Sequence, residues 1–91
     1  MKIIFKHSHL CPISRAAKRE LEAFLENNEQ TFEYELVNVI ENRERSNEIE
    51  QKYGIPHESP QVIILDENDN VIWHESHRAI KADAIRDAIN I

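Results

Sequence analysis

The one cysteine of this chain, Cys11, lies in the stretch CPIS, directly before Pro12 and three residues before Ser14. Proline is well suited to the first turn of a helix, so we predict that a helix begins at Pro12. The unpaired N–H groups and positive dipole end of such a helix favour the thiolate form of a neighbouring cysteine. The Ser14 hydroxyl would lie on the same helix face and could donate to the sulfur. The pattern therefore predicts a catalytic group of Cys11, Pro12 and Ser14, with Cys11 as the nucleophile.

The spacing C-x-x-S is that of the C-x-x-C redox motif with serine at the second position. A dithiol enzyme resolves its mixed disulfide internally, whereas Cys11 would need an external thiol. The motif therefore predicts monothiol exchange with a low-molecular-weight thiol. Basic residues near Cys11 in the sequence are expected to support the thiolate: Lys6, His7, His9, Arg15 and Lys18. The alternative is an inert, buried cysteine that acts as a small hydrophobic residue.

A second candidate loop, Ser59–Pro60–Gln61, comes directly before an apolar run. In a thioredoxin-like chain a cis-proline lies at this point opposite the cysteine, and we predict a cis Ser59–Pro60 bond. The backbone of Ser59 would then be open to an extended substrate strand. The alternative is an ordinary trans proline at the start of a strand.

The histidines offer a weaker signal. His7, His9 and Cys11 alternate, and in a fully extended segment all three could face a metal ion. The first strand must bend into the cysteine loop, however, and no carboxylate is spaced to complete the site, so we expect no metal. We expect His77 near the active-site end of the sheet, and Trp73 as a core residue. The remaining histidines of the second half are interpreted as surface or partner-binding groups: His57 and His74.

These residues need a scaffold, and the hydrophobic pattern predicts one. Short β-branched runs and period-2 alternation indicate strands, and apolar residues at three- and four-residue steps indicate helices. The expected strands are KIIF (2–5), TFEYELVNV (31–39), QVIIL (61–65) and VIWHES (71–76). The expected helices are 12–25, 41–54 and 79–91, the second packing through Ile49, Tyr53 and the flanking Ile40 and ending at Gly54.

The resulting order is β-α-β-α-β-β-α. Two strand–helix–strand crossovers imply parallel pairing, and the turn DENDN (66–70) makes the last two strands a hairpin. We therefore predict an α/β, thioredoxin- or glutaredoxin-like domain over residues 1–91, with a mixed four-stranded sheet flanked by helices.

Composition narrows the function classes. The chain has 91 residues, a hydrophobic fraction of 41%, a formal charge of −6 and a pI near 5.3. A net acidic surface argues against a broad grip on nucleic acid or on an anionic membrane. The opening MKIIFKH is too short for a signal sequence or a membrane span. We expect a cytoplasmic monomer that binds neither nucleic acid nor membrane.

Three segments resemble the monothiol bacilliredoxins of the thioredoxin superfamily, which are tied to the low-molecular-weight thiol bacillithiol. The segments are FKHSHLCPISRAA, YGIPHESPQVIIL and VIWHESHRAI. The resemblance implies removal of bacillithiol from mixed disulfides on oxidised proteins through a Cys11 mixed disulfide. It implies S-thiolated client proteins as partners, bacillithiol or a similar thiol as co-substrate, and no tightly bound cofactor. In addition to the catalytic group, we expect five residues at the substrate, and all of them match the family's motifs. They are Ile13, Ser59, Pro60, Gln61 and His77.

Two other functions remain open at this stage. One is an iron–sulfur carrier in which two protomers each give one Cys11 and small thiols complete the cluster. Monothiol glutaredoxins of that kind have a glycine and an aromatic residue where this chain has Pro12 and Ile13. The other is a thioredoxin-fold adaptor in which only the peptide-binding loop still functions.

Overall fold

The computed structural model describes residues 1–28 and 30–89. The strands are β1 (Lys2–His7), β2 (Glu33–Asn38), β3 (Gln61–Leu65) and β4 (Val71–Ser76). The helices are α1 (Pro12–Glu26), α2 (Arg43–Tyr53) and α3 (Ala82–Ile89), with a short 3-10 helix, η1 (His77–Ala79), before α3. The predicted order of strands and long helices is confirmed. Residues 90–91 of the predicted last helix lie outside the described residues.

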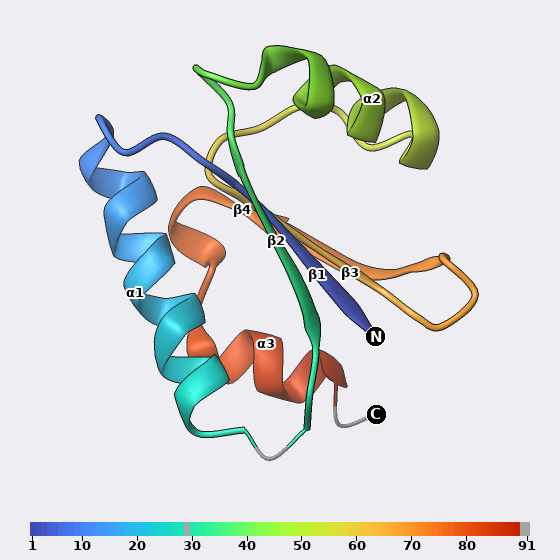
Figure 1. Cartoon of the computed structure of the whole chain (residues 1–91). Helices are drawn as coiled ribbons and strands as arrows, with labels where there is room; N and C mark the ends of the chain where they lie inside the picture. Colours follow the sequence, from blue (N-terminus) through green and yellow to red (C-terminus); the bar gives the residue numbers. More distant parts are fainter. Residues whose placement is uncertain (29, 90–91) are drawn as a thin grey trace.

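The four strands form one mixed sheet in the order β2-β1-β3-β4. β1 pairs with β2 in parallel and with β3 antiparallel, and β3 pairs antiparallel with β4. This arrangement follows from the connections, because a helix joins the two parallel strands and a tight turn joins the last two. Figure 1 shows α1 and α3 on one side of the sheet and α2 on the other.

Each face of the sheet has its own apolar core, because the side chains of a strand alternate between faces. Ile3 and Phe5 of β1 point toward α1 and α3, where they pack with Leu21 and Ile85. The core on the other face is smaller: Ile4 packs there with residues of β2, α2 and β3, namely Val37, Ile49, Ile63 and Leu65. Helix α2 ends at Gly54 as predicted, and this glycine adopts a left-handed conformation with φ 67°.

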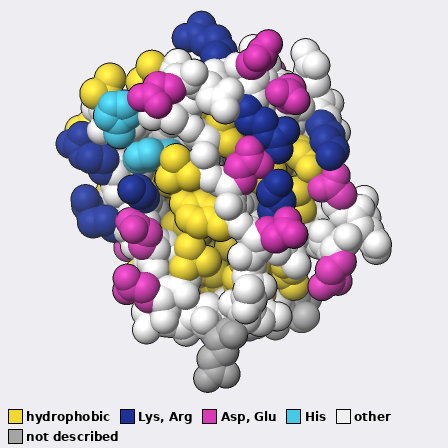
Figure 2. All heavy atoms as spheres, viewed as in Figure 1, with side chains coloured by type: hydrophobic (Ala, Val, Ile, Leu, Met, Phe, Trp, Pro, Cys, Tyr) yellow, Lys and Arg dark blue, Asp and Glu magenta, His cyan; other side chains and the backbone are white. Residues whose placement is uncertain are grey.

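Edge strand β2 is only partly covered by the rest of the protein. Its alternation correctly indicates a strand, but Tyr34 and Leu36 are 40% and 42% exposed, while Val37 is buried. Figure 2, which has the same view as Figure 1, shows hydrophobic side chains open to solvent in the middle of the molecule, on the side where β2 lies. Ile40 is 49% exposed and does not pack with α2 as predicted, because it lies in the turn before that helix. Edge strands have a neighbour on one side only, which leaves such side chains partly uncovered.

Two further observations complete the fold. Trp73 is half-buried at the margin of the α1–α3 core, because β4 is the other edge of the sheet, so the predicted core position is only partly correct. Within the described residues, no helix is long and apolar enough to cross a membrane.

Candidate functional site

Three loops meet at one end of the sheet. The register places Lys6 of β1 opposite Gln61 of β3, and Gln61 opposite Ser76 of β4. The loop that leaves β1 toward Cys11, the loop that enters β3 through Pro60 and the segment that leaves β4 at His77 are therefore neighbours in space. This is where the sequence motifs are brought together.

Cys11 is the N-cap residue of α1, and Pro12 occupies the first turn as predicted. Its backbone is extended, with φ −101° and ψ 122°, and its carbonyl accepts the Arg15 N–H at 3.0 Å. The Cys11 N–H donates to the Ser8 carbonyl at 3.2 Å, which closes the loop between strand and helix. The first turn of α1 has no side-chain cap and no acidic residue, so no carboxylate competes with the partly exposed thiol for the positive end of the helix.

The predicted hydrogen bond from Ser14 to the Cys11 sulfur is wrong for this structure. Ser14 is fully buried, and within the described residues its hydroxyl contacts other groups. It accepts the Ser8 N–H at 2.9 Å and shares a hydrogen bond with Nδ1 of His7 at 2.8 Å. The reason is that the end of β1 lies beneath the first turn of α1. Ser14 therefore clamps the cysteine loop to the strand, and its hydroxyl makes no hydrogen bond to the sulfur in the part of the chain that the structure describes.

The histidines before Cys11 diverge. His7 is buried and stacks on Phe5, with ring centroids 5.3 Å apart, whereas His9 contacts Asn38, with Nδ1 and Nδ2 3.0 Å apart. Burial lowers the pKa of His7, with smaller contributions from Lys18 and His9, so the ring is neutral near pH 7. Over residues 1–28 and 30–89, no group of three or more His, Cys, Asp or Glu side chains is arranged to hold a metal ion.

The Ser59–Pro60 bond is cis, as predicted. The Pro60 carbonyl accepts the His77 N–H at 3.0 Å, which ties this loop to the end of β4. In the described part of the chain, the backbone of Ser59 makes no hydrogen bond and its buried hydroxyl has no partner. Backbone groups of this kind can pair with an extended substrate.

Gln61 does not lie where a substrate could reach its side chain. It is 1% exposed and its Nε2 donates to the Pro56 carbonyl at 3.1 Å. We correct its expected role from substrate contact to support of the loop, because its position in β3 directs it to the α2 side of the sheet beside Lys6.

Sequence reasoning missed a polar cluster below this loop. Lys6 is fully buried and contacts His57, with Nζ and Nδ1 3.2 Å apart, and the Ser46 hydroxyl approaches the same nitrogen at 3.1 Å. Burial lowers the pKa of Lys6, and nearby Glu50 opposes the shift. Lys6 thus faces α2 and is not part of the expected basic group around Cys11. Its one sequence signal is a lysine that directly follows the apolar run Ile3–Ile4–Phe5 in β1.

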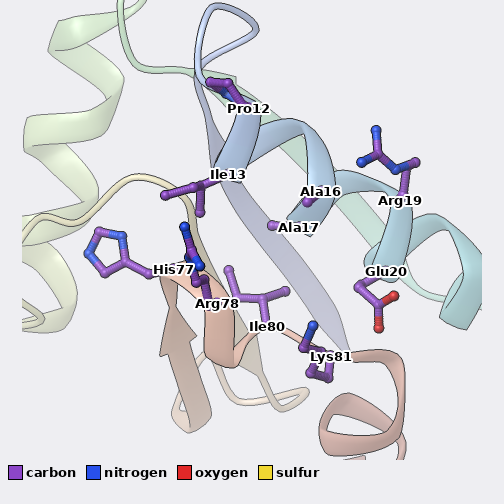
Figure 3. A pocket seen from close by; sticks show the side chains of 10 residues that line it. All are labelled: Pro12, Ile13, Ala16, Ala17, Arg19, Glu20, His77, Arg78, Ile80 and Lys81. Carbon is purple, nitrogen blue, oxygen red and sulfur yellow. The ribbon is translucent and has the colours of Figure 1, made fainter.

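His77 stands at the third loop with an unusual backbone conformation, φ 57°. Histidine enters this left-handed region more often than most residues, but it remains uncommon for any side chain with a Cβ. Its ring is exposed and contacts Glu58, with Nε2 and Oε2 2.5 Å apart. Together with Pro12 and Ile13 it lines a groove of about 460 Å³ between α1 and the η1 segment (Figure 3).

This arrangement defines a thiol protein of the thioredoxin fold, with one cysteine at a helix start and a cis-proline loop at the same end of the sheet. The chain belongs to the monothiol bacilliredoxin family: the model of the family described as monothiol bacilliredoxin BrxC matches residues 1–85. The class of activity is that of a thiol oxidoreductase.

Solved structures share the fold. A thioredoxin-fold protein described as a candidate oxidoreductase is 31% identical, with a TM-score of 0.86 over 96% of this chain and 75% of its own. Thioredoxin 1 from the thermophilic eubacterium Thermosipho africanus TCF52B is 24% identical, with a TM-score of 0.73 over 99% of this chain and 91% of its own. The Trx4 domain of ERdj5 shares the fold at 15% identity and a TM-score of 0.58, over 97% of this chain and 75% of its own.

Proposed function

We propose that this protein removes bacillithiol, or a closely similar low-molecular-weight thiol, from mixed disulfides on client proteins. The observation that carries the proposal is the position of Cys11, a partly exposed N-cap whose first-turn amides have no side-chain cap. The chain contains no second cysteine that could resolve a mixed disulfide, so the sulfur acquired by Cys11 must leave to an external thiol.

The exchange takes two steps. The Cys11 thiolate attacks the sulfur of the small thiol in the client's mixed disulfide, a new sulfur–sulfur bond forms, and the client cysteine leaves as thiolate and takes a proton from water. A second small thiol then attacks the adduct as thiolate. It leaves oxidised, as a disulfide with the first, and Cys11 is free again.

The neighbouring residues have distinct tasks in this proposal. The open backbone of Ser59 pairs with the peptide or thiol backbone beside the disulfide, while Pro60 holds that loop against His77. Pro12 and Ile13 form the apolar wall next to the sulfur, and Ser14 fixes the loop from below. Ser14 is therefore a positioning residue.

The proposed setting is the cytoplasm, with the protein acting as a monomer on S-thiolated clients. A reducing compartment supplies the free thiol that the second step consumes, and it keeps a lone cysteine reduced between turnovers. No bound cofactor enters the reaction, since sulfur exchange requires only the two thiols and the disulfide.

The test is transfer of mass onto Cys11. The protein is mixed with a bacillithiolated test protein, with a glutathionylated one in parallel, and both partners are followed by intact mass spectrometry. We expect a bacillithiol-sized adduct on the wild type, reduced test protein in equal amount, and no adduct on Cys11→Ala. A reduced test protein with the Cys11→Ala variant, or no adduct from either donor on the wild type, would refute the proposal.

A further inference from the structure

The groove beside the cysteine loop is unusually basic for this protein. Its walls come from the first turns of α1 and from the segment that joins β4 to α3 (Figure 3). Three cations lie on it, Arg19, Arg78 and Lys81, together with one carboxylate, Glu20. The chain as a whole carries a formal charge of −6, so this local excess of positive charge stands out.

The cations of the groove form no ion pair with other described residues. Among the ion pairs of the described residues, none involves Arg19, Arg78 or Lys81. The one acidic side chain is occupied, because Glu20 Oε1 accepts the Ala82 N–H at 3.0 Å at the start of α3. Figure 2 shows further Lys, Arg and His side chains gathered on the α1 side of the molecule. Unpaired cations around a concave surface attract an anionic ligand.

Size and location indicate what kind of anion. Between the cations the wall is apolar and built from small or branched side chains, Ala16, Ala17 and Ile80. A volume of about 460 Å³ lies within the range of small-molecule sites. The groove begins at Pro12 and Ile13, the two residues directly after Cys11, so one end of it adjoins the cysteine along the chain.

We propose that this groove binds the carboxylate groups of the small thiol while its sulfur exchanges at Cys11, with Arg78 and Lys81 as the principal anion-binding residues and Arg19 at the rim. The inference rests on the proposed function and adds a selection rule to it. The enzyme prefers anionic small thiols because their carboxylates contact these cations, whereas the client contacts the loop around Ser59. Guanidinium and ammonium groups are the side chains that proteins use to hold carboxylates.

The test uses one cysteine peptide carrying either of two small thiols as mixed disulfide: mercaptosuccinate, which has two carboxylates, or mercaptoethanol, which has none. The rate of Cys11 thiolation is measured by intact mass spectrometry for the wild type and for Arg78→Gln/Lys81→Gln. We expect the double variant to react about three- to tenfold more slowly with the mercaptosuccinate disulfide, since each exposed pair contributes modestly. Its rate with the mercaptoethanol disulfide should be unchanged.

Two controls sharpen the result. Arg86→Gln removes one positive charge from α3 beside Asn27, near the opposite end of α1, and should leave both rates unchanged. The charge-conserving Arg78→Lys/Lys81→Arg should restore most of the preference for mercaptosuccinate. High salt should weaken that preference in the wild type and have little effect in the glutamine variant.

A second peptide, with acidic residues around the cysteine, tests whether the groove binds an acidic segment of the client and not the small thiol. If the loss in the double variant follows the charge of the peptide and not that of the thiol, the groove binds an acidic client segment and the proposal is wrong. Equal rates for wild type and variant with every donor would also overturn it. In either case, transfer from the mercaptoethanol disulfide would show that Cys11 is still active, so failure here is distinct from failure of the proposed function.

Discussion

The two helices that follow the parallel strands begin at the same end of the sheet, yet their first turns are built differently. Helix α2 starts at Asn42, whose side chain accepts the Arg45 N–H at 3.3 Å, and it has Glu44 in its first turn. Helix α1 starts at Cys11, which gives no side-chain cap, and its first turn has no acidic residue. The first turn of α2 thus serves stability, whereas that of α1 leaves its amides without a side-chain cap beside Cys11.

This difference indicates a trade between stability and chemistry within one small fold. A capped helix start is more stable by about 1 kcal/mol than one with an apolar residue at the N-cap position. Helix α1 lacks that contribution at the place where the proposed nucleophile lies. Functional sites commonly retain features that lower stability, because a better-capped alternative would remove the reactive group.

The largest expected effect comes from giving α1 the cap that α2 already has. Cys11→Ser should abolish thiol transfer, because the hydroxyl cannot form the mixed disulfide, and should raise the free energy of unfolding by about 1 kcal/mol, because its oxygen can accept a first-turn amide. The measurements are the adduct assay and urea denaturation. Cys11→Ala is the matched control, equally inactive but without the gain. Equal stability of the two variants would contradict the comparison.

The next largest effect concerns the clamp below the cysteine loop. Ser14→Ala should lower the free energy of unfolding by about 1–3 kcal/mol, because the Ser8 N–H and the buried His7 ring each lose a partner. Transfer onto Cys11 should slow but persist. Ser8→Ala is the control, since the bond to Ser14 uses only the backbone of Ser8. Complete loss of transfer in a folded Ser14→Ala variant would instead give this hydroxyl a direct part in the chemistry.

Ser14 also shows where sequence reasoning reaches its limit. Pro12 and the hydrophobic periodicity around the motif correctly predict a strand followed by a helix, because both signals act locally. It cannot show which partner the hydroxyl chooses, since that depends on how the end of β1 places His7 beneath the helix. The same holds for Gln61. The motif Ser59–Pro60–Gln61 can be recognised in the sequence, but the sequence does not show that the Gln61 side chain is buried on the α2 side of the sheet.

The fold was more predictable than the site for the same reason. Alternation in β2 indicates a strand, and only the sheet order shows that Tyr34 and Leu36 remain exposed at its edge. The basic groove was not predicted at all, because Arg78 and Lys81 approach α1 only after the chain turns at His77. No local pattern in the sequence predicts that a histidine adopts a left-handed conformation there.

A smaller effect comes from the ion pair that fastens the first turn of α2 to the sheet. Glu35 Oε2 accepts from Arg45 Nε at 2.7 Å and Glu35 Oε1 lies 3.1 Å from Lys2 Nζ. Hydrogen bonds from Arg45, with a smaller contribution from Lys2, lower the pKa of Glu35 to about 2. The unfolded chain therefore binds this proton more readily, and the stabilisation present above pH 4.5 is lost as the pH falls toward 2.

Glu35→Gln should reveal this contribution. We expect the variant to be less stable by about 1–2 kcal/mol at pH 7, since the pair is partly exposed and screened, and to lose less stability than the wild type between about pH 4.5 and about pH 2. The measurement is urea denaturation across that range. Parallel pH profiles for the two proteins would show that the carboxylate does not carry the effect. The matched control is Glu33→Gln, because Glu33 is exposed and lies two residues before Glu35 in the same strand.

The smallest expected effect tests the other side of the comparison. Asn42→Ala removes the cap of α2 and should lower the free energy of unfolding by about 1 kcal/mol, because the Arg45 N–H loses its acceptor. Transfer onto Cys11 should be unchanged, since α2 packs on the opposite face of the sheet from α1. Asn42→Asp should keep the stability, because aspartate caps as well as asparagine. If Asn42→Ala slowed transfer onto Cys11 in addition to lowering stability, the two helix starts would be coupled. The distinction between a first turn that serves stability, in α2, and one that serves the thiol chemistry, in α1, would then fail.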